Sequence, residues 1–273
     1  MVSIVCAAMA ITIATWNINS VRLRVEVVKK FLHEADPDVL CLQETKTPDE
    51  HFPREAFAAA GYEHQLVHGM KAYNGVAVIS RIPFDGHGTR NWCEREDCRH
   101  GHVLLRGGIE LHNIYVPAGG DIPDPDENPK FAHKLKFLSE IATWFKAARH
   151  SGAPMVLVGD LNVAPLENDV WSHQQLLKVV SHTPVEVKRL KALQKSARFV
   201  DAVRFFVPAS ENLYTWWSYR AIDWAKSDRG RRLDHIWVTE PLKDRLFGAT
   251  IHREVRGWDL ASDHVPVVMR LMS

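Results

Sequence analysis

The sequence has few cysteines, no long hydrophobic run and almost no net charge. Four cysteines in 273 residues are too few for a disulfide-stabilised scaffold and are typical of a protein in a reducing compartment. No apolar run approaches the roughly 18 residues that a membrane-spanning helix needs. Lys and Arg number 34 and Asp and Glu 33, a formal net charge of +1. Overall charge therefore indicates no polyanionic partner, and we expect a cytoplasmic protein that does not bind membranes.

An apolar stretch at residues 1–14 could be mistaken for a secretion signal. It lacks the basic residues that precede the apolar part of a signal peptide, and it continues directly into a predicted strand. We therefore expect residues 1–10 to form an N-terminal extension and residues 11–273 to form one domain.

Short apolar runs alternate with helical periodicity along the whole chain. The runs predict strands at residues 11–16, 39–43, 75–80, 103–106, 109–116, 155–161, 233–239 and 265–271. Apolar residues at helical spacing predict helices over residues 21–32, 131–145 and 186–197. This order indicates a single α/β domain with the sheet structure in the middle and helices outside.

Polar side chains follow or precede most of the predicted strands. A single polar residue beside a strand is a turn or helix-cap residue about as often as it is a functional residue. Several polar side chains that meet at one sheet edge would be costly to bury if they had no function. Together they therefore indicate an active site. These residues are Asn17, Asn19, Glu44, Tyr115, Asp160, Asn162, Asp234, Asp263 and His264.

A local basic stretch contrasts with the neutral total. Residues 183–232 carry eleven bases and five acids, a balance of +6, together with Trp216, Trp217, Tyr219 and Trp224. This combination suits a polyanion with bases or sugars to pack against. A solvated helix next to ordinary core aromatics would give the same composition.

Seven motifs resemble the exonuclease III class of AP endonucleases, within the endonuclease/exonuclease/phosphatase superfamily. They occur in the family's order and span nearly the whole chain: TWNINSVRLR (15–24), DVLCLQETK (38–46), NGVAVISR (74–81), IYVP (114–117), GDLNVAP (159–165), RRLDHIWVT (231–239) and SDHVPV (262–267). The resemblance implies an α/β (α+β) four-layer sandwich, in which two packed mixed β-sheets are flanked by helices in a single domain. Residues 11–273 are expected to form this domain.

The resemblance also implies one divalent-metal site at the sheet ends. Glu44 matches the family's metal-binding glutamate and is a suitable ligand for Mg²⁺, with Mn²⁺ as the expected substitute. Asn17 lies at the matching position of the first strand and is expected to help hold the metal. Asp160, Asn162 and Asp263 complete the expected metal-binding set.

Five residues have catalytic roles by the same resemblance. Asp160 is expected to deprotonate the attacking water, and Asn162 to orient it. His264 matches the histidine that contacts the scissile phosphate, and Asp234 matches the acid that orients this histidine. Tyr115 offers a phenol beside the leaving group or a phosphate oxygen. Asp263 either holds the imidazole or approaches the metal; the sequence leaves both open.

The expected DNA contacts lie in the basic stretch. Trp216 and Leu233 match walls of the pocket that receives an extrahelical abasic sugar in the DNA-repair branch. At a third pocket position, where relatives commonly carry a bulky apolar residue, this chain has Arg231. Because a guanidinium pairs well with phosphate and is costly in an apolar cavity, we expect Arg231 to point outward to a DNA phosphate. Entry into the DNA beside the lesion is the alternative.

A separate cluster raises the question of zinc. Cys93, Cys98, His100 and His102 place four potential ligands within ten residues. The spacing is not that of a standard zinc finger or ribbon, so free thiols on a surface loop are the simpler expectation.

The sequence therefore predicts a monomeric, Mg²⁺-dependent DNA-repair phosphodiesterase. Its expected substrates are double-stranded DNA with abasic sites, cut 5′ to the lesion, and blocked 3′ ends, with 3′→5′ exonuclease and 3′-phosphodiesterase activity in base-excision repair. A superfamily phosphatase acting on small or lipid phosphoesters and a non-catalytic DNA-binding relative are the alternatives. The basic aromatic stretch disfavours the first, and the complete set of catalytic residues disfavours the second.

Overall fold

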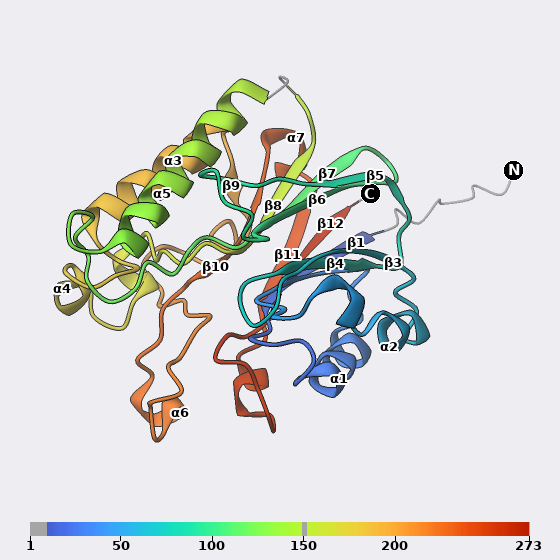
Figure 1. The fold of residues 1–273 in the computed structure, drawn as a ribbon, viewed down its shortest axis with the longest axis horizontal. Coiled ribbons are helices and arrows are strands. Elements are labelled where there is room, and N and C mark those ends of the chain that lie inside the picture. Colours follow the sequence, from blue (N-terminus) through green and yellow to red (C-terminus); the bar gives the residue numbers. More distant parts are fainter. Residues whose placement is uncertain (1–9, 149–151, 273) are drawn as a thin grey trace, which may run out of the picture.

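A computed structural model describes residues 10–148 and 152–272, and two six-stranded sheets pack face to face at its centre (Figure 1). The first sheet has the order β11 (Leu246–Ile251), β12 (Val267–Met272), β1 (Ala10–Asn17), β2 (Val39–Gln43), β4 (Val76–Ser80), β3 (His64–His68). The second has the order β5 (Phe84–Thr89), β6 (His100–Leu105), β7 (Ile109–Ile114), β8 (Met155–Asp160), β10 (Asp234–Val238), β9 (Val200–Asp201). Both sheets are mixed, since β1–β2 and β7–β8 are parallel pairs and the other neighbours are antiparallel.

Helices cover the outer faces of the two sheets. In Figure 1, α1 (Val25–Ala35) and α2 (Arg54–Ala59) lie along the first sheet, and α3 (Pro129–Ala148) and α5 (Pro184–Ser196) lie side by side along the second. Shorter helices lie in the connections: α4 (His173–Leu176), α6 (Trp224–Ser227), α7 (Glu240–Lys243) and the 3-10 turns Asp49–His51, Glu167–Asp169 and Arg253–Gly257. The expected four-layer sandwich is confirmed.

Successive side chains of each central strand point to opposite faces of its sheet, and this alternation divides the core into layers. In β1, Ile13 packs between the sheets, whereas Trp16 faces α1 and contacts Phe31. In β8, Val158 packs between the sheets, whereas Leu157 faces the helices of the second sheet. Because both faces of these strands are buried, their sequences are continuous apolar runs and were recognisable as strands.

The structure adds four strands to the eight that the sequence predicts. These are β3, β5, β9 and β11, and all four are edge strands of their sheets. Edge strands are partly solvated and carry polar residues and glycine, as in the FDGHGT of β5. They therefore lack the apolar runs that mark central strands.

Element boundaries differ slightly from the prediction at the chain's turns. Val21 is buried against α1, but the helix itself begins only at Val25. Residues 1–9 of the predicted extension lie outside the described residues, while Ala10 pairs with Met272 in the first sheet.

No helix among the described residues is long and apolar enough to cross a membrane.

Candidate active site

The predicted catalytic and metal-binding residues meet at one end of the two sheets. The carboxyl ends of the parallel pairs β1–β2 and β7–β8 meet at this edge, and the antiparallel strands β10 and β12 begin there. A hydrogen bond of 2.9 Å from Asn17 Nδ2 to Asp160 Oδ2 joins the two sheets at this point. The residues on these strand ends and the adjoining loops are Asn17, Glu44, Tyr115, Asp160, Asn162, Asp234, Asp263 and His264.

The backbone at the strand ends has unusual conformations. Asn19, Glu44 and Asn162 are left-handed, with φ of 46°, 52° and 53°. Such residues cost of order 1–3 kcal/mol each and persist where the surrounding structure holds them, often at active sites. Gly159 has a φ of 137°, and a Cβ there would lie 1.9 Å from the carbonyl oxygen of Ile114. A glycine is therefore required directly before Asp160.

A network of short hydrogen bonds surrounds Glu44. Its Oε1 accepts hydrogen bonds from Asn17 Nδ2 at 2.9 Å and from the Tyr115 hydroxyl at 2.8 Å. Its Oε2 forms an ion pair with Lys46 Nζ at 2.7 Å. Burial by itself would raise the pKa of Glu44, but Lys46 and Asn17 lower it below its usual value. The carboxylate is therefore ionised at neutral pH and ready to bind a cation.

Tyr115 stays protonated in this setting. Burial raises the pKa of the phenol well above its usual value, and the negative charge of Glu44 raises it further. The hydroxyl donates to Glu44, so the structure places it as a support for the expected metal ligand.

Asp160 is fully buried and central to the site. One of its oxygens, Oδ2, accepts hydrogen bonds from Asn17 Nδ2 at 2.9 Å and Asn162 Nδ2 at 3.0 Å. Burial raises its pKa to about 7, and the charge of Asp234 acts in the same direction, whereas His264 opposes it. A pKa near neutrality is suited to a general base.

His264 is held by a buried carboxylate. Its Nδ1 lies 2.8 Å from Asp234 Oδ2, which also accepts a hydrogen bond of 2.7 Å from the Thr215 hydroxyl. Its other nitrogen, Nε2, lies 3.8 Å from Asp160 Oδ2. Burial would lower the pKa of His264, but Asp234 and Asp160 raise it to about 10. The ring is therefore cationic and can face a phosphate oxygen.

Asp263 has a different setting from Asp234. It accepts a hydrogen bond of 2.9 Å from Trp216 Nε1 and one of 3.0 Å from Asn19 Nδ2. Of the two roles that the sequence leaves open, holding the imidazole belongs to Asp234. Asp263 links the site to the wall of the neighbouring cleft, and its approach to the metal stays a prediction.

The cleft next to the carboxylates has a volume of about 600 Å³. Its walls include Trp216, Leu233 and Arg231, the three expected DNA-binding residues, together with Glu44 and His264. Sequence reasoning included Arg220 and Arg229 of the same walls only as members of the basic stretch. It missed further wall residues that come from loops with no strand or motif pattern: Trp171, Val180 and Ser181.

Arg231 does not point outward from this cleft. Its guanidinium stacks over Trp216 at 5.3 Å, and Nη1 donates to the Val180 carbonyl at 3.0 Å and to Ser181 Oγ at 2.8 Å. The expected outward orientation is therefore wrong. The side chain can lie in the wall because Trp216 and the polar groups of Val180 and Ser181 compensate for part of its desolvation.

The donors at the strand ends fit a hard divalent cation. Glu44 and Asp160 supply two carboxylates with Asn17 between them, and carboxylate oxygens are what Mg²⁺ prefers. The Nδ2 of Asn17 faces both carboxylates, so this amide holds the ligand oxygens in place. Asp160, Asp234 and His264 also lie close enough together to hold an ion.

The four potential zinc ligands at residues 93–102 do not come together as one group. Cys93 and Cys98 are buried rather than exposed on a surface loop. The backbone N–H of Cys93 donates to Glu140, and the Cys98 thiol donates to the Gly69 carbonyl at 3.5 Å. Among the described residues, the group of His and Cys side chains at metal-ligand spacing unites His100, His102 and His112, without either cysteine.

Known proteins match nearly the whole chain. The Endonuclease/Exonuclease/phosphatase family matches residues 14–264. Exodeoxyribonuclease III of Haemophilus influenzae is 27% identical over 93% of this chain and 97% of its own. An AP endonuclease structure from Archaeoglobus fulgidus has 32% identity and a TM-score of 0.88, covering 95% of this chain and 98% of the other. A 3′-5′ exonuclease from Neisseria meningitidis has 27% identity and a TM-score of 0.89, covering 96% and 100%. The chain therefore belongs to the endonuclease/exonuclease/phosphatase family, and within it to the exonuclease III group of AP endonucleases.

Proposed function

We propose that this protein is a Mg²⁺-dependent endonuclease that cuts duplex DNA 5′ to abasic sites, and that it also removes nucleotides and blocking groups from 3′ ends in base-excision repair. The observation that carries the proposal is the joining of Glu44, Asp160 and the His264–Asp234 pair beside one aromatic-walled cleft. The similar chains include an AP endonuclease, a 3′-5′ exonuclease and a Neisseria 3′ phosphatase bound to product DNA hairpin.

The protein residues divide the hydrolysis between them. Asp160 accepts the proton of the attacking water, and Asn162, 3.0 Å from Asp160 Oδ2, orients that water. The new bond joins the water oxygen to phosphorus, and the bond to the 3′ oxygen of the preceding nucleotide breaks. His264 donates a hydrogen bond to a phosphate oxygen, with Asp234 fixing the ring. Glu44 holds the metal, which supplies charge neutralisation at the phosphate when it is bound.

The cleft supports selection of abasic sites. Extrusion of a nucleotide from the duplex costs least where the base is already missing, so a small pocket can select the lesion without reading sequence. Trp216 and Leu233 offer apolar walls for a bare sugar. The indole N–H of Trp216 donates to Asp263, which fixes the ring.

All these groups come from one chain, which supports the monomer that we propose. The free Cys41, Cys93 and Cys98 support the cytoplasmic location that we propose, because thiols stay reduced there.

One cleavage assay tests the proposal. The protein is incubated with a duplex that holds a single abasic analogue, with Mg²⁺ or with EDTA, and the cut position is mapped on both strands. We expect one cut directly 5′ to the analogue, with a 3′-hydroxyl end, and no cut in EDTA. Cleavage of small phosphoesters in the absence of any DNA cleavage would assign the protein to the phosphatases instead.

A further inference from the structure

Three histidines meet on the outer face of the second sheet. His100 and His102 are two residues apart on β6, so both side chains point to the same face. His112 on β7 lies directly opposite His102 in the antiparallel register. The sequence separates His112 from the other two by a turn, and only this register brings it to them.

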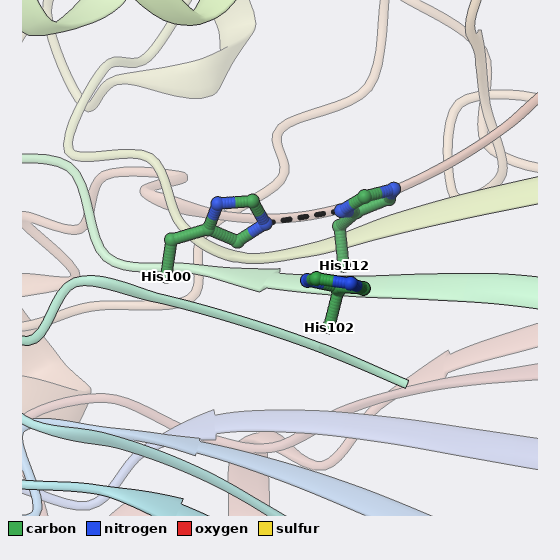
Figure 2. A group of neighbouring side chains, drawn as sticks. All are labelled: His100, His102 and His112. Atoms are coloured by element: carbon green, nitrogen blue, oxygen red, sulfur yellow. Dashed lines mark hydrogen bonds between the residues drawn. The ribbon is translucent and has the colours of Figure 1, made fainter. Parts of the chain in front are cut away.

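The three rings are close enough to share one ion. One ring nitrogen from each histidine lies within 4.8 Å of the others, and Nε2 of His100 lies 3.0 Å from Nδ1 of His112 (Figure 2). Tetrahedral Zn²⁺ with bonds of roughly 2.0–2.1 Å places its ligand nitrogens about 3.4 Å apart. Nε2 of His100 and Nδ1 of His112 are at hydrogen-bond distance, 3.0 Å, and must move apart slightly to bind one ion. His102 is half-buried, and one of its ring nitrogens lies within 4.8 Å of the other two ligand nitrogens.

Aromatic side chains fix the two buried rings. Trp92 stacks on His100 with 5.6 Å between the ring centroids. Trp144 packs edge-on against His100 and His112, with centroid distances of 6.0 Å and 5.6 Å. Phe145 packs against His112 at 5.0 Å. Rings held by such packing lose little conformational freedom when they bind an ion.

The nitrogens of His100 and His112 that do not face each other, Nδ1 and Nε2 respectively, have no hydrogen-bond partner among the described residues. Nε2 of His112, the atom opposite the one that faces His100, lies 3.3 Å from Glu110 Oε1. This is proximity and not a formed hydrogen bond, because Nε2 of His112 has no hydrogen-bond partner among the described residues. A carboxylate commonly lies beside the outer N–H of a metal-binding histidine. Nδ1 of His102 is buried and has no hydrogen-bond partner among the described residues. A buried polar atom without a partner is rare and requires an explanation.

The charge state of His100 and His102 is also suitable. Burial lowers the pKa of His100 well below its usual value, and neighbouring histidines lower it further. Burial likewise lowers the pKa of His102, although Glu110 opposes the effect. Neutral imidazoles keep the lone pairs that a metal needs. Arg90 is the nearby cation that opposes a metal, and its guanidinium stacks on Trp144 at 5.0 Å.

We propose that His100, His102 and His112 form a second metal site, which binds a transition metal ion such as Zn²⁺ and is separate from the Mg²⁺ site. The donor chemistry distinguishes the two sites, because imidazole nitrogens suit Zn²⁺ whereas carboxylate oxygens suit Mg²⁺. Three histidines leave a fourth position for water. Since the ion joins β6 to β7 beneath α3, its binding stabilises the folded chain.

Metal binding to the full chain tests the proposal. The protein is dialysed against limiting Zn²⁺ in excess Mg²⁺, which competes for the catalytic carboxylates, and bound zinc is measured together with the melting temperature. We expect one zinc per chain and a melting temperature that rises with Zn²⁺ concentration. His102→Ala removes the half-buried ligand and should lower the affinity at least tenfold. His33→Ala, on the exposed side of α1, is the matched control and should bind zinc as the unmodified chain does.

A second variant keeps the test decisive if His102→Ala does not fold. Glu110→Gln retains the size of a partly exposed side chain and removes the charge beside His112, so it should weaken zinc binding about 10- to 100-fold without unfolding the chain. Substitution of Co²⁺ for Zn²⁺ should give the absorption of a tetrahedral nitrogen-bound ion. Absence of bound zinc in the unmodified chain, or zinc binding that both variants leave unchanged, would overturn the proposal.

Discussion

Nδ1 of His264 lies 2.8 Å from Oδ2 of Asp234, and this contact directs the other ring nitrogen toward Asp160. The carboxylate sits at the start of β10 and the histidine just before β12, in different sheets. The packing of the two sheets therefore sets the orientation of the imidazole. Thr215 holds Asp234 in turn, through a hydrogen bond of 2.7 Å.

Asp234→Asn should disturb this orientation without removing the histidine. The amide keeps the shape but no longer stabilises a cationic ring, so we expect kcat to fall by roughly 10²-fold or more. The KM for abasic duplex should change little, because Asp234 acts through His264. Steady-state kinetics separate the two constants. A rise in KM at unchanged kcat would mean that the pair only binds substrate.

Asp160→Asn should nearly abolish cleavage, with a loss of roughly 10²- to 10⁴-fold, and leave DNA binding intact. The substitution removes the proton acceptor and keeps the shape at the centre of the network. Single-turnover cleavage and a binding assay in EDTA measure the two effects. Asp85→Asn, an exposed change on β5, is the control and should retain activity. Full activity of Asp160→Asn would remove the mechanism proposed above.

Glu44→Gln should act mainly through the metal. Loss of the ionised carboxylate weakens Mg²⁺ binding by at least about tenfold, so the Mg²⁺ concentration at half-maximal activity should rise by this factor. Raising Mg²⁺ should restore part of the activity. A loss that no Mg²⁺ concentration relieves would indicate that Glu44 takes part in the chemical step itself.

His235 predicts a loss of stability in acid. Burial lowers its pKa to about 4, with a further contribution from Arg232, and Nε2 lies 2.9 Å from the Val163 carbonyl. The folded pKa lies below the ordinary value of about 6.5, so the unfolded chain binds the proton first. Stability from this group is complete above pH 6.5 and is lost as the pH falls toward 4.

His235→Gln isolates this effect, because glutamine can donate to Val163 and does not titrate. The free energy of unfolding of the unmodified chain should fall relative to the variant by up to about 3 kcal/mol between pH 7 and pH 4. Urea unfolding at a series of pH values measures the difference. Parallel curves for the two proteins would contradict the buried neutral state of His235.

The sequence predicts the central strands and their ends better than the edges of the molecule. Strand β2, at residues 39–43, is buried on both faces, and its apolar run predicts the bounds that the structure has. Glu44 directly follows it, so the motif also locates the residue at the sheet edge. The cleft wall at Trp171 and Ser181 could not be foreseen, because these residues come from loops whose path depends on contacts with distant segments. His112 was missed for a related reason, since only strand register places it beside His102.

The position of Arg231 in the cleft wall changes what its removal should do. A guanidinium that contacts only DNA phosphate would contribute equally to abasic and intact duplex. Arg231 instead stacks on Trp216 and is anchored by Val180 and Ser181. We therefore expect Arg231→Ala to lower kcat/KM on abasic duplex more than it lowers the affinity for intact duplex. Trp216→Ala should share this selective loss, because the two side chains form one wall.

Arg220, which is exposed at the mouth of the same cleft, provides the matched comparison for Arg231. Arg220→Ala should weaken binding to abasic and intact duplexes by similar factors and reduce the salt slope by about one, as expected for a phosphate contact. Affinities for both duplexes across a range of salt concentrations, together with cleavage rates, separate the two arginines. The contrary result would be that Arg231→Ala lowers the affinity for both duplexes equally and flattens the salt slope. That result would mean that Arg231 leaves the wall to contact phosphate when DNA binds, and that Trp216 and Leu233 alone form the pocket.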